Sequence, residues 1–146
     1  YMNNVHLWAY WIFIKENKIL LIKKSRWPYT WMYDLPWWWI EFLETIEECL
    51  KREIDEETWA LIYKNEFIWK NEYICEYKNE SNELKKSHHI GFYYKVYITY
   101  NELKTWPDWQ DSLGAKFIDI KEIDKIKISP IAKPMILKVI NSNIKQ

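Results

Sequence analysis

The side chains best suited to chemistry lie in segment 45–58, where carboxylates are concentrated. If this segment is a helix with about 100° per residue, Leu50 and Ile54 belong to its apolar stripe. Glu53 and Glu57 then project from the middle of that stripe, and Glu56 projects from its border. Burying an unpaired carboxylate is costly, and a hard divalent cation with oxygen ligands, Mg²⁺ first, is the simplest compensation. The alternative is that this end of the helix leaves the core and its acids are solvated.

The helix that must carry these acids has clear start signals. Thr45 and Glu48 have the T-x-x-E spacing of a capping box, and no proline follows within the segment. Glu47, Glu48 and Asp55 fall on the opposite side of the wheel, where acidic residues are ordinary solvated side chains. The sequence therefore predicts a helix over 45–58 with Glu53 and its neighbours turned inward.

The remaining elements are predicted from hydrophobic periodicity and turn residues. Apolar, β-rich runs predict strands over 5–14 and 18–23, joined by a tight turn at 16–17. Residues 25–44 are expected to form a long loop, and such a loop inside a compact domain is usually functional. Further strands are expected over 67–77, 89–99 and 115–120, polar loops over 78–87 and 101–114, and a closing helix over 131–140. This order of elements predicts an α/β domain with a mixed β-sheet.

Composition excludes several classes of protein. The 146 residues include 21 Lys+Arg and 21 Asp+Glu, so the formal net charge is zero. This balance gives no electrostatic footprint for nucleic acid, and no apolar run reaches the roughly 18 residues of a membrane span. The first residues do not read as a signal peptide, and Cys49 and Cys75 are too few for a disulfide scaffold. We therefore expect a single-domain cytoplasmic protein, monomer or homodimer, with no nucleic-acid or membrane partner.

Tryptophan and glycine have exchanged their usual abundances: the chain has 11 Trp and 2 Gly, whereas glycine ordinarily makes up roughly 7% of residues. Several tryptophans stand where the backbone favours glycine: Trp59 at the end of the helix, 37–39 before it, Trp109 in a Pro-Asp turn pattern and Trp27 in the long loop. We interpret this as a coding effect, because some bacterial lineages read UGA as glycine whereas another common genetic code reads it as tryptophan. The alternative is a Trp-rich surface that binds carbohydrate or peptide, which leaves the inward acids unexplained.

Segment 38–60 resembles the Nudix box, G-x5-E-x7-R-E-U-x-E-E-x-G-U. The charged positions of the box are all filled, in chain order by Glu44, Arg52, Glu53, Glu56 and Glu57. The chain departs from the pattern at the two glycines, where it has Trp38 and Trp59, and Leu43 stands where glycine is common. The flanking segments are also similar to the family, so the resemblance extends over about residues 5–140.

The resemblance implies both a fold and an activity. The fold is an α/β/α sandwich with a mixed β-sheet, forming one Nudix domain over residues 1–146. The activity is hydrolysis of a nucleoside diphosphate linked to another moiety, with Mg²⁺ as cofactor and Mn²⁺ as an alternative. The partner is therefore a small-molecule nucleotide substrate, and the products are a nucleoside monophosphate and a second phosphorylated compound. If the tryptophans are literal, the alternative is a catalytically impaired Nudix-fold protein that binds or senses a nucleotide.

The resemblance also implies roles for individual residues. The implied metal ligands are Glu53, Glu56, Glu57 and the backbone carbonyl of Trp37. Glu53 is our expected general base for the attacking water. Arg52 would orient the carboxylates through charge-assisted hydrogen bonds, and Glu44 would complete the site between loop and helix.

Three residues outside the box have side chains that can bind phosphate or metal: Arg26, His88 and His89. Arg26 lies in the loop that leads to the box, and its guanidinium suits phosphate recognition, so it is a candidate substrate contact. The alternative for Arg26 is an ordinary solvated loop residue. His88 and His89 have no third ligand at metal spacing, so we interpret them as structural or surface residues.

Overall fold

The computed structural model describes residues 4–25, 29–79, 81–103 and 112–143, and the structural statements below refer to these residues. In chain order the elements are β1 (Asn4–Ile12), β2 (Ile14–Lys15), β3 (Lys18–Lys24), β4 (Tyr33–Asp34), β5 (Trp37–Trp39), α1 (Ile46–Thr58), β6 (Leu61–Lys78), β7 (Leu84–Thr99), β8 (Ser112–Asp119), a 3₁₀-helix η1 (Ile120–Lys125) and α2 (Lys133–Asn143).

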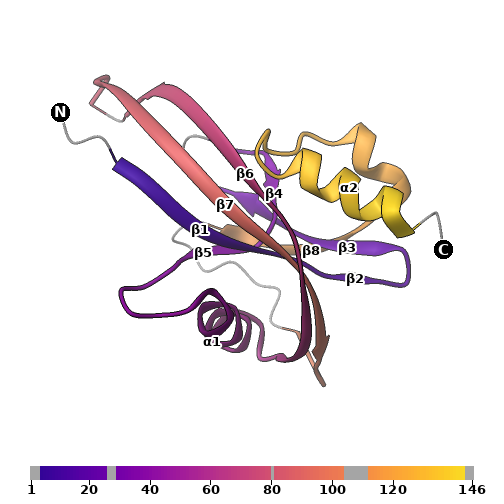
Figure 1. Ribbon diagram of the computed structural model, residues 1–146. Helices are drawn as coiled ribbons and strands as arrows, with labels where there is room; N and C mark the ends of the chain where they lie inside the picture. Colours follow the sequence, from indigo (N-terminus) through magenta and orange to yellow (C-terminus); the bar gives the residue numbers. More distant parts are fainter. Residues whose placement is uncertain (1–3, 26–28, 80, 104–111, 144–146) are drawn as a thin grey trace.

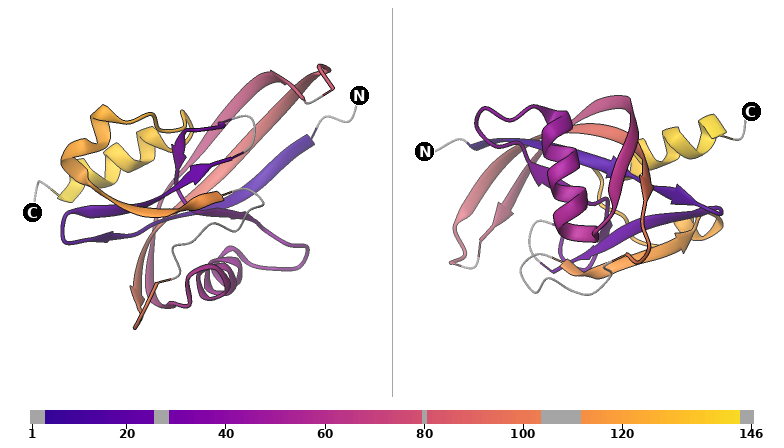
Figure 2. Two further views of the ribbon diagram at one scale, coloured as in Figure 1. Left: turned by 180° about the vertical axis from the view of Figure 1, so that it is seen from behind. Right: turned by 90° about the horizontal axis from the view of Figure 1, so that it is seen from below.

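The strands form two β-sheets (Figure 1). The first has the order β5-β1-β7-β6, in which β1 pairs in parallel with β7, while β5 and β6 are antiparallel to their neighbours. In the second, β3 pairs with β2, β4 and β8. The helices α1 and α2 lie on opposite sides of the first sheet (Figure 2). The predicted α/β class with a mixed sheet is therefore confirmed.

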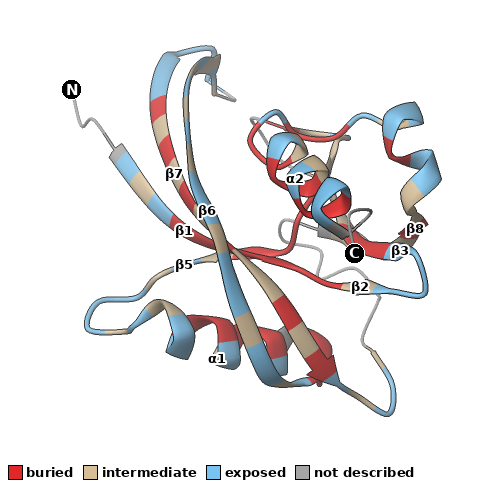
Figure 3. Ribbon diagram, turned by 45° about the vertical axis from the view of Figure 1, so that its right-hand side comes forward, coloured by how far each residue is buried: buried red, intermediate tan, exposed pale blue. Residues whose placement is uncertain are grey.

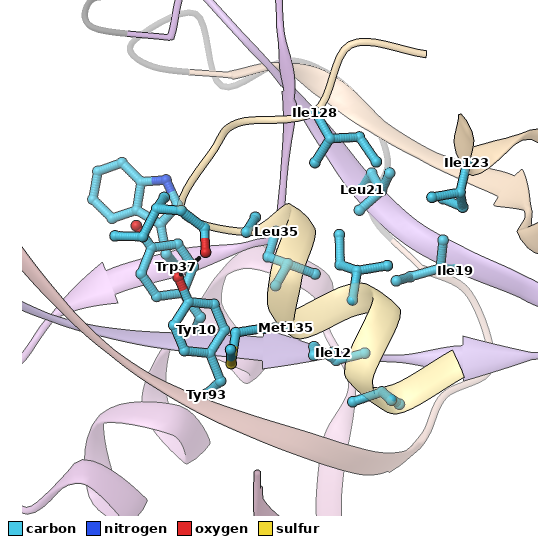
Figure 4. Close-up of a cluster of buried hydrophobic side chains, with 14 of the residues drawn as sticks. Tyr10, Ile12, Ile19, Leu21, Leu35, Trp37, Tyr93, Ile123, Ile128 and Met135 are labelled. Atoms are coloured by element: carbon cyan, nitrogen blue, oxygen red, sulfur yellow. Dashed lines mark hydrogen bonds between the residues drawn. The ribbon is translucent and has the colours of Figure 1, made fainter. Parts of the chain in front are cut away.

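Strand β1 contributes to two buried clusters, one on each face of the first sheet (Figure 3). Successive side chains of a strand point to opposite faces. Ala9 and Trp11 accordingly pack with Leu50 of α1, whereas Tyr10 and Ile12 belong to the cluster around α2 (Figure 4). This alternation holds the two helices on a common sheet.

The predicted N-terminal hairpin is confirmed. Glu16 and Asn17 connect β2 to β3 with φ of 51° and 59°. Positive φ at both central residues is the signature of a type I′ turn, whose twist matches the flanking strands. The run predicted as one strand over 5–14 is interrupted at Phe13, so β1 and β2 are separate.

Both helices are present, although only the first has the predicted limits. Helix α1 begins after Thr45 and ends at Thr58, as its capping box and the following residue predict. Helix α2 covers Lys133–Asn143 rather than 131–140, because a turn at Ser129 precedes it. Within the described parts of the chain, neither helix is long and apolar enough to cross a membrane.

Several predicted loops and strand limits are wrong. The loop expected over 25–44 contains β4 and β5, and the loop expected over 78–87 ends at Leu84, where β7 begins. The first three residues of β7, Leu84–Lys86, are all exposed, so no alternation of buried and exposed residues marks this end of the strand. It pairs with the end of β6, and an ion pair between Lys86 and Glu76, at 2.7 Å, adds to that pairing. Strand β8 begins at Ser112, earlier than the predicted 115, and η1 was not predicted.

Candidate active site

Helix α1 begins where the capping box predicts. The Oγ1 of Thr45 accepts a hydrogen bond from the Glu48 N–H at 3.3 Å, and the Thr45 N–H donates to Oε2 of Glu48 at 2.9 Å. Cys49, Leu50 and Ile54 are buried on the face of α1 that packs on the first sheet. That packing fixes the rotation of the helix and therefore determines which of its acids face inward.

Glu53 is buried, as its place on the helical wheel predicts, with 5% of its side chain exposed. Its Oε1 forms an ion pair with Nη1 of Arg52. The contact does not have hydrogen-bond geometry, so Oε1 is a buried acceptor without a hydrogen-bond partner among the described residues. Arg52 compensates part of the charge of this buried carboxylate, and an oxygen without a hydrogen bond can also bind a divalent cation.

Arg52 joins the helix to the loop before it. Its Nε donates to Oε1 of Glu44 at 2.7 Å and its Nη2 donates to Oε2 at 2.9 Å, a bidentate pair. Glu44 also accepts the backbone N–H of Glu41 at 3.1 Å. The hydrogen bond from Arg52 holds the pKa of Glu44 below its ordinary value, and Glu44 raises the pKa of Arg52. The pair is therefore charged near neutral pH and fixes the end of the loop beside Glu53.

The other two carboxylates of the box lie in the following turn of α1. The Glu56 side chain is 63% exposed, and its Oε2 is 3.9 Å from Nη1 of Arg52. Glu57 belongs to the last turn, and its side chain lies outside the described part. Among the described side chains, no three His, Cys, Asp or Glu residues gather as a metal-binding group. Glu53, Glu56 and Glu57 are nevertheless three and four residues apart, a spacing that puts residues on one face of a helix. Carboxylate oxygens in this arrangement are suited to a hard divalent cation.

The loop side of the expected site differs in part from the prediction. Trp37 begins β5, an edge strand in which it pairs with Tyr10 of β1, so residues 37–39 are an extended strand rather than a glycine-type loop. Aromatic residues fit such a pleated, half-buried surface. Arg26, Trp27 and Trp109 lie outside the described residues.

The helix ends at Trp59 in the left-handed conformation, with φ of 59° and ψ of 22°. Its N–H donates to the Asp55 carbonyl at 2.8 Å, a termination that usually carries glycine. The expected left-handed end of the helix at this position is therefore confirmed. Trp31 and Leu43 also have positive φ, 67° in both cases.

Sequence reasoning missed a cluster of buried residues on the sheet face opposite α1. The Trp37 ring stacks on Trp8 at a centroid distance of 4.0 Å, and Nζ of the buried Lys24 lies 4.1 Å from the centroid of Trp37. The Trp8 ring also contacts His89 at 4.5 Å, and Tyr29 lies 6.1 Å beyond. His89 is buried, so of the two expected alternatives it is structural rather than a surface residue, and its burial lowers its pKa to about 4. The only available signal was the alternation of β1, which places Trp8 on this face.

Comparison with known sequences identifies the family. The NUDIX domain profile matches residues 5–139. The ADP-ribose pyrophosphatase of Methanocaldococcus jannaschii is 32% identical over 112 residues, which are 77% of this chain. The matched part spans 60% of the length of that relative.

Solved structures show the same fold at low sequence identity. A MutT protein from Methanosarcina mazei Go1 has a TM-score of 0.72 at 14% identity, with 98% of each chain covered. A MutT NUDIX hydrolase from Burkholderia pseudomallei has a TM-score of 0.70 at 16% identity, covering 94% of this chain and 99% of the other. The NUDIX domain of Shewanella oneidensis NrtR, solved with ADP ribose, has a TM-score of 0.69 at 13% identity over 97% of this chain and 89% of the other. With this fold, the charged residues of the box in register and a family profile that covers most of its length, the chain belongs to the Nudix family.

Proposed function

We propose that the protein hydrolyses the pyrophosphate bond of a nucleoside diphosphate linked to another moiety, in a Mg²⁺-dependent reaction. The observation that carries this proposal is the burial of the Glu53 carboxylate, which is ion-paired with Arg52 beside the Arg52–Glu44 pair. The similarity to an ADP-ribose pyrophosphatase makes ADP-ribose the first substrate to test. Its hydrolysis would give AMP and ribose 5-phosphate.

In this proposal the cation is held by Glu53, Glu56, Glu57 and the carbonyl of Trp37. When bound, Mg²⁺ or Mn²⁺ supplies positive charge to the pyrophosphate and lowers the pKa of a coordinated water. Glu53 takes the proton of the attacking water as general base. Water adds to one phosphorus atom, and the bridging P–O bond breaks.

Two arginines have separate tasks in the proposal. Arg52 positions the loop carboxylate Glu44 through its bidentate hydrogen bonds and neutralises part of the charge near Glu53. Arg26 contacts the phosphates of the substrate, because its planar fork matches two phosphate oxygens.

The assay follows the release of AMP from ADP-ribose in the presence of Mg²⁺. Glu53→Gln and Glu57→Gln should each lower turnover by at least about 100-fold, the usual contribution of a general base. Glu47→Gln is the matched control, because Glu47 is an exposed acid in the first turn of the same helix. Equal turnover in Glu53→Gln and Glu47→Gln would overturn the assignment of the site.

A second function, nucleotide binding without hydrolysis, is favoured by one observation. Trp37–Trp39 places three indoles at the start of the box, where the family has glycines. ADP-ribose binding measured by calorimetry, together with no product formation under any divalent metal, would support this function against the first.

A further inference from the structure

Strand β6 is a long edge strand with little covering it. It ends the first sheet, whose order is β5-β1-β7-β6, and among the described residues no strand pairs with its other edge. None of its 18 residues is buried, whereas buried residues recur along its neighbour β7 (Figure 3). An open edge presents unpaired N–H and C=O groups, so a strand of this length is a place where a second chain can pair.

The sequence of β6 contains the triplet Lys-Asn-Glu twice, at 64–66 and at 70–72. Two copies of such a triplet are complementary when they pair antiparallel about a two-fold axis, because the lysine of each then faces the glutamate of the other. Opposite charges directly across two strands stabilise their pairing, and like charges destabilise it. The charge pattern of this edge therefore matches a second copy of the same edge.

The second triplet lies in the regular half of β6. The pairing of β6 with β7 shifts register at 62–64 and at 67–69, on either side of the first triplet, but it is uninterrupted from 69 to 78. Bulges disturb the row of backbone groups at an edge and protect it against pairing. The regular half of the strand is therefore the part open to a partner, with Asn71 at the centre of its triplet.

The exposed apolar residues of β6 fit a two-fold axis at Asn71. Phe67 and Ile74 are 52% and 69% exposed, although both side chains are large and apolar. Counted along β7, each is three ladder steps from Asn71, on opposite sides of it. The axis would thus place Phe67 of one copy opposite Ile74 of the other. Both lie an odd number of steps from Asn71, as do Lys70 and Glu72, so these four side chains share one face of the sheet.

We propose that the protein forms a homodimer in which the β6 edges of two copies pair antiparallel about Asn71, so that their first sheets become one continuous sheet. At its centre Lys70 of each copy faces Glu72 of the other, and Phe67 of each faces Ile74 of the other. None of these residues is a tryptophan, so the pairing is the same whichever residue the codons at the tryptophan positions specify. The inference goes beyond the proposed function, because no residue of the box takes part in the interface.

The two triplets provide a variant and a matched control. In each, the lysine forms an ion pair with the glutamate two residues later, at 2.8 Å for Lys70–Glu72 and 2.9 Å for Lys64–Glu66. Lys70→Glu would place two glutamates opposite each other at both symmetry-related positions, so the Kd of the dimer should rise at least about tenfold. Lys64→Glu breaks an equivalent ion pair away from the axis and should change the Kd by less than about threefold.

Exchanging the two charges distinguishes pairing between copies from an effect on the single chain. The double variant Lys70→Glu/Glu72→Lys again places opposite charges across the axis, so its Kd should return to within about threefold of the parent value. The Kd is measured by sedimentation equilibrium, and circular dichroism of each variant establishes that the fold is retained.

A parent protein that stays monomeric up to millimolar concentration would overturn the homodimer. A dimer that Lys70→Glu and Lys64→Glu weaken equally, or one that the double exchange does not restore, would overturn the pairing about Asn71. Hydrolysis of ADP-ribose by a monomeric protein would leave the proposed function standing, and a dimer with the predicted charge dependence but no hydrolysis would do the opposite.

Discussion

Replacing Leu43 with glycine should stabilise the protein, although it removes a whole apolar side chain. Leu43 is the third residue of a turn in which the Glu44 N–H donates to the Glu41 carbonyl at 3.1 Å, and its φ is 67°. A non-glycine residue in left-handed conformation costs about 1–2 kcal/mol, and glycine loses roughly 0.5–1 kcal/mol through its freer unfolded chain. The side chain is 88% exposed, so little burial is lost. The net gain is about 0.5–1 kcal/mol, or roughly 2–3 °C in Tm.

The neighbouring residue provides the control. Phe42 is 93% exposed and is not among the described residues with positive φ. Phe42→Gly therefore carries only the entropic cost and should lower the stability by roughly 0.5–1 kcal/mol. Thermal and urea unfolding followed by circular dichroism compare the two variants. A Leu43→Gly protein that is destabilised as much as Phe42→Gly would refute the assignment of strain to this turn.

Three further predictions follow from the site and the core. Arg52→Lys cannot form the bidentate pair with Glu44 and should lower the free energy of unfolding by about 1 kcal/mol; an unchanged urea midpoint would contradict this. The folded-state pKa of His89 is lowered to about 4 from 6.5, so the unfolded chain binds more protons between these values and stability falls as pH drops. The loss should reach about 3 kcal/mol at pH 4 and be absent in His89→Gln, measured by urea unfolding at several pH values. If glycine is the encoded residue at the left-handed positions Trp31 and Trp59, both codons are UGA and peptides of the native protein carry glycine there; UGG codons would exclude it.

Helix α1 was predictable from sequence because its signals are local. The capping box at Thr45 and the apolar stripe through Leu50 and Ile54 depend only on residues within a few turns of one another. The same wheel predicts Glu53 as a buried acid, and the family resemblance predicts that Arg52 and Glu44 lie together, as their hydrogen bond shows. The left-handed end of the helix at Trp59 was likewise a local prediction.

The features that sequence reasoning missed depend on contacts between distant segments. Strand β5 exists because residues 37–39 pair with β1, nearly thirty residues earlier, and no periodicity within three tryptophans indicates this. His89 was interpreted as structural or surface because no third metal ligand stands at the right spacing, and the sequence did not decide between these two alternatives. The parallel pairing of β1 with β7 is what brings it against Trp8 and buries it. Position on one face of a sheet is thus predictable from alternation, whereas the partner across the sheet is not.

The most direct test of the central claim is a calorimetric titration of the protein with Mg²⁺, and with Mn²⁺, in the absence of nucleotide. We predict a saturable site in the parent protein that is retained in Glu47→Gln and lost or weakened at least about tenfold in Glu53→Gln. Circular dichroism of each variant would establish that the fold is retained. Identical metal affinity in the parent and Glu53→Gln proteins would contradict the claim that the inward carboxylates of α1 hold a divalent cation.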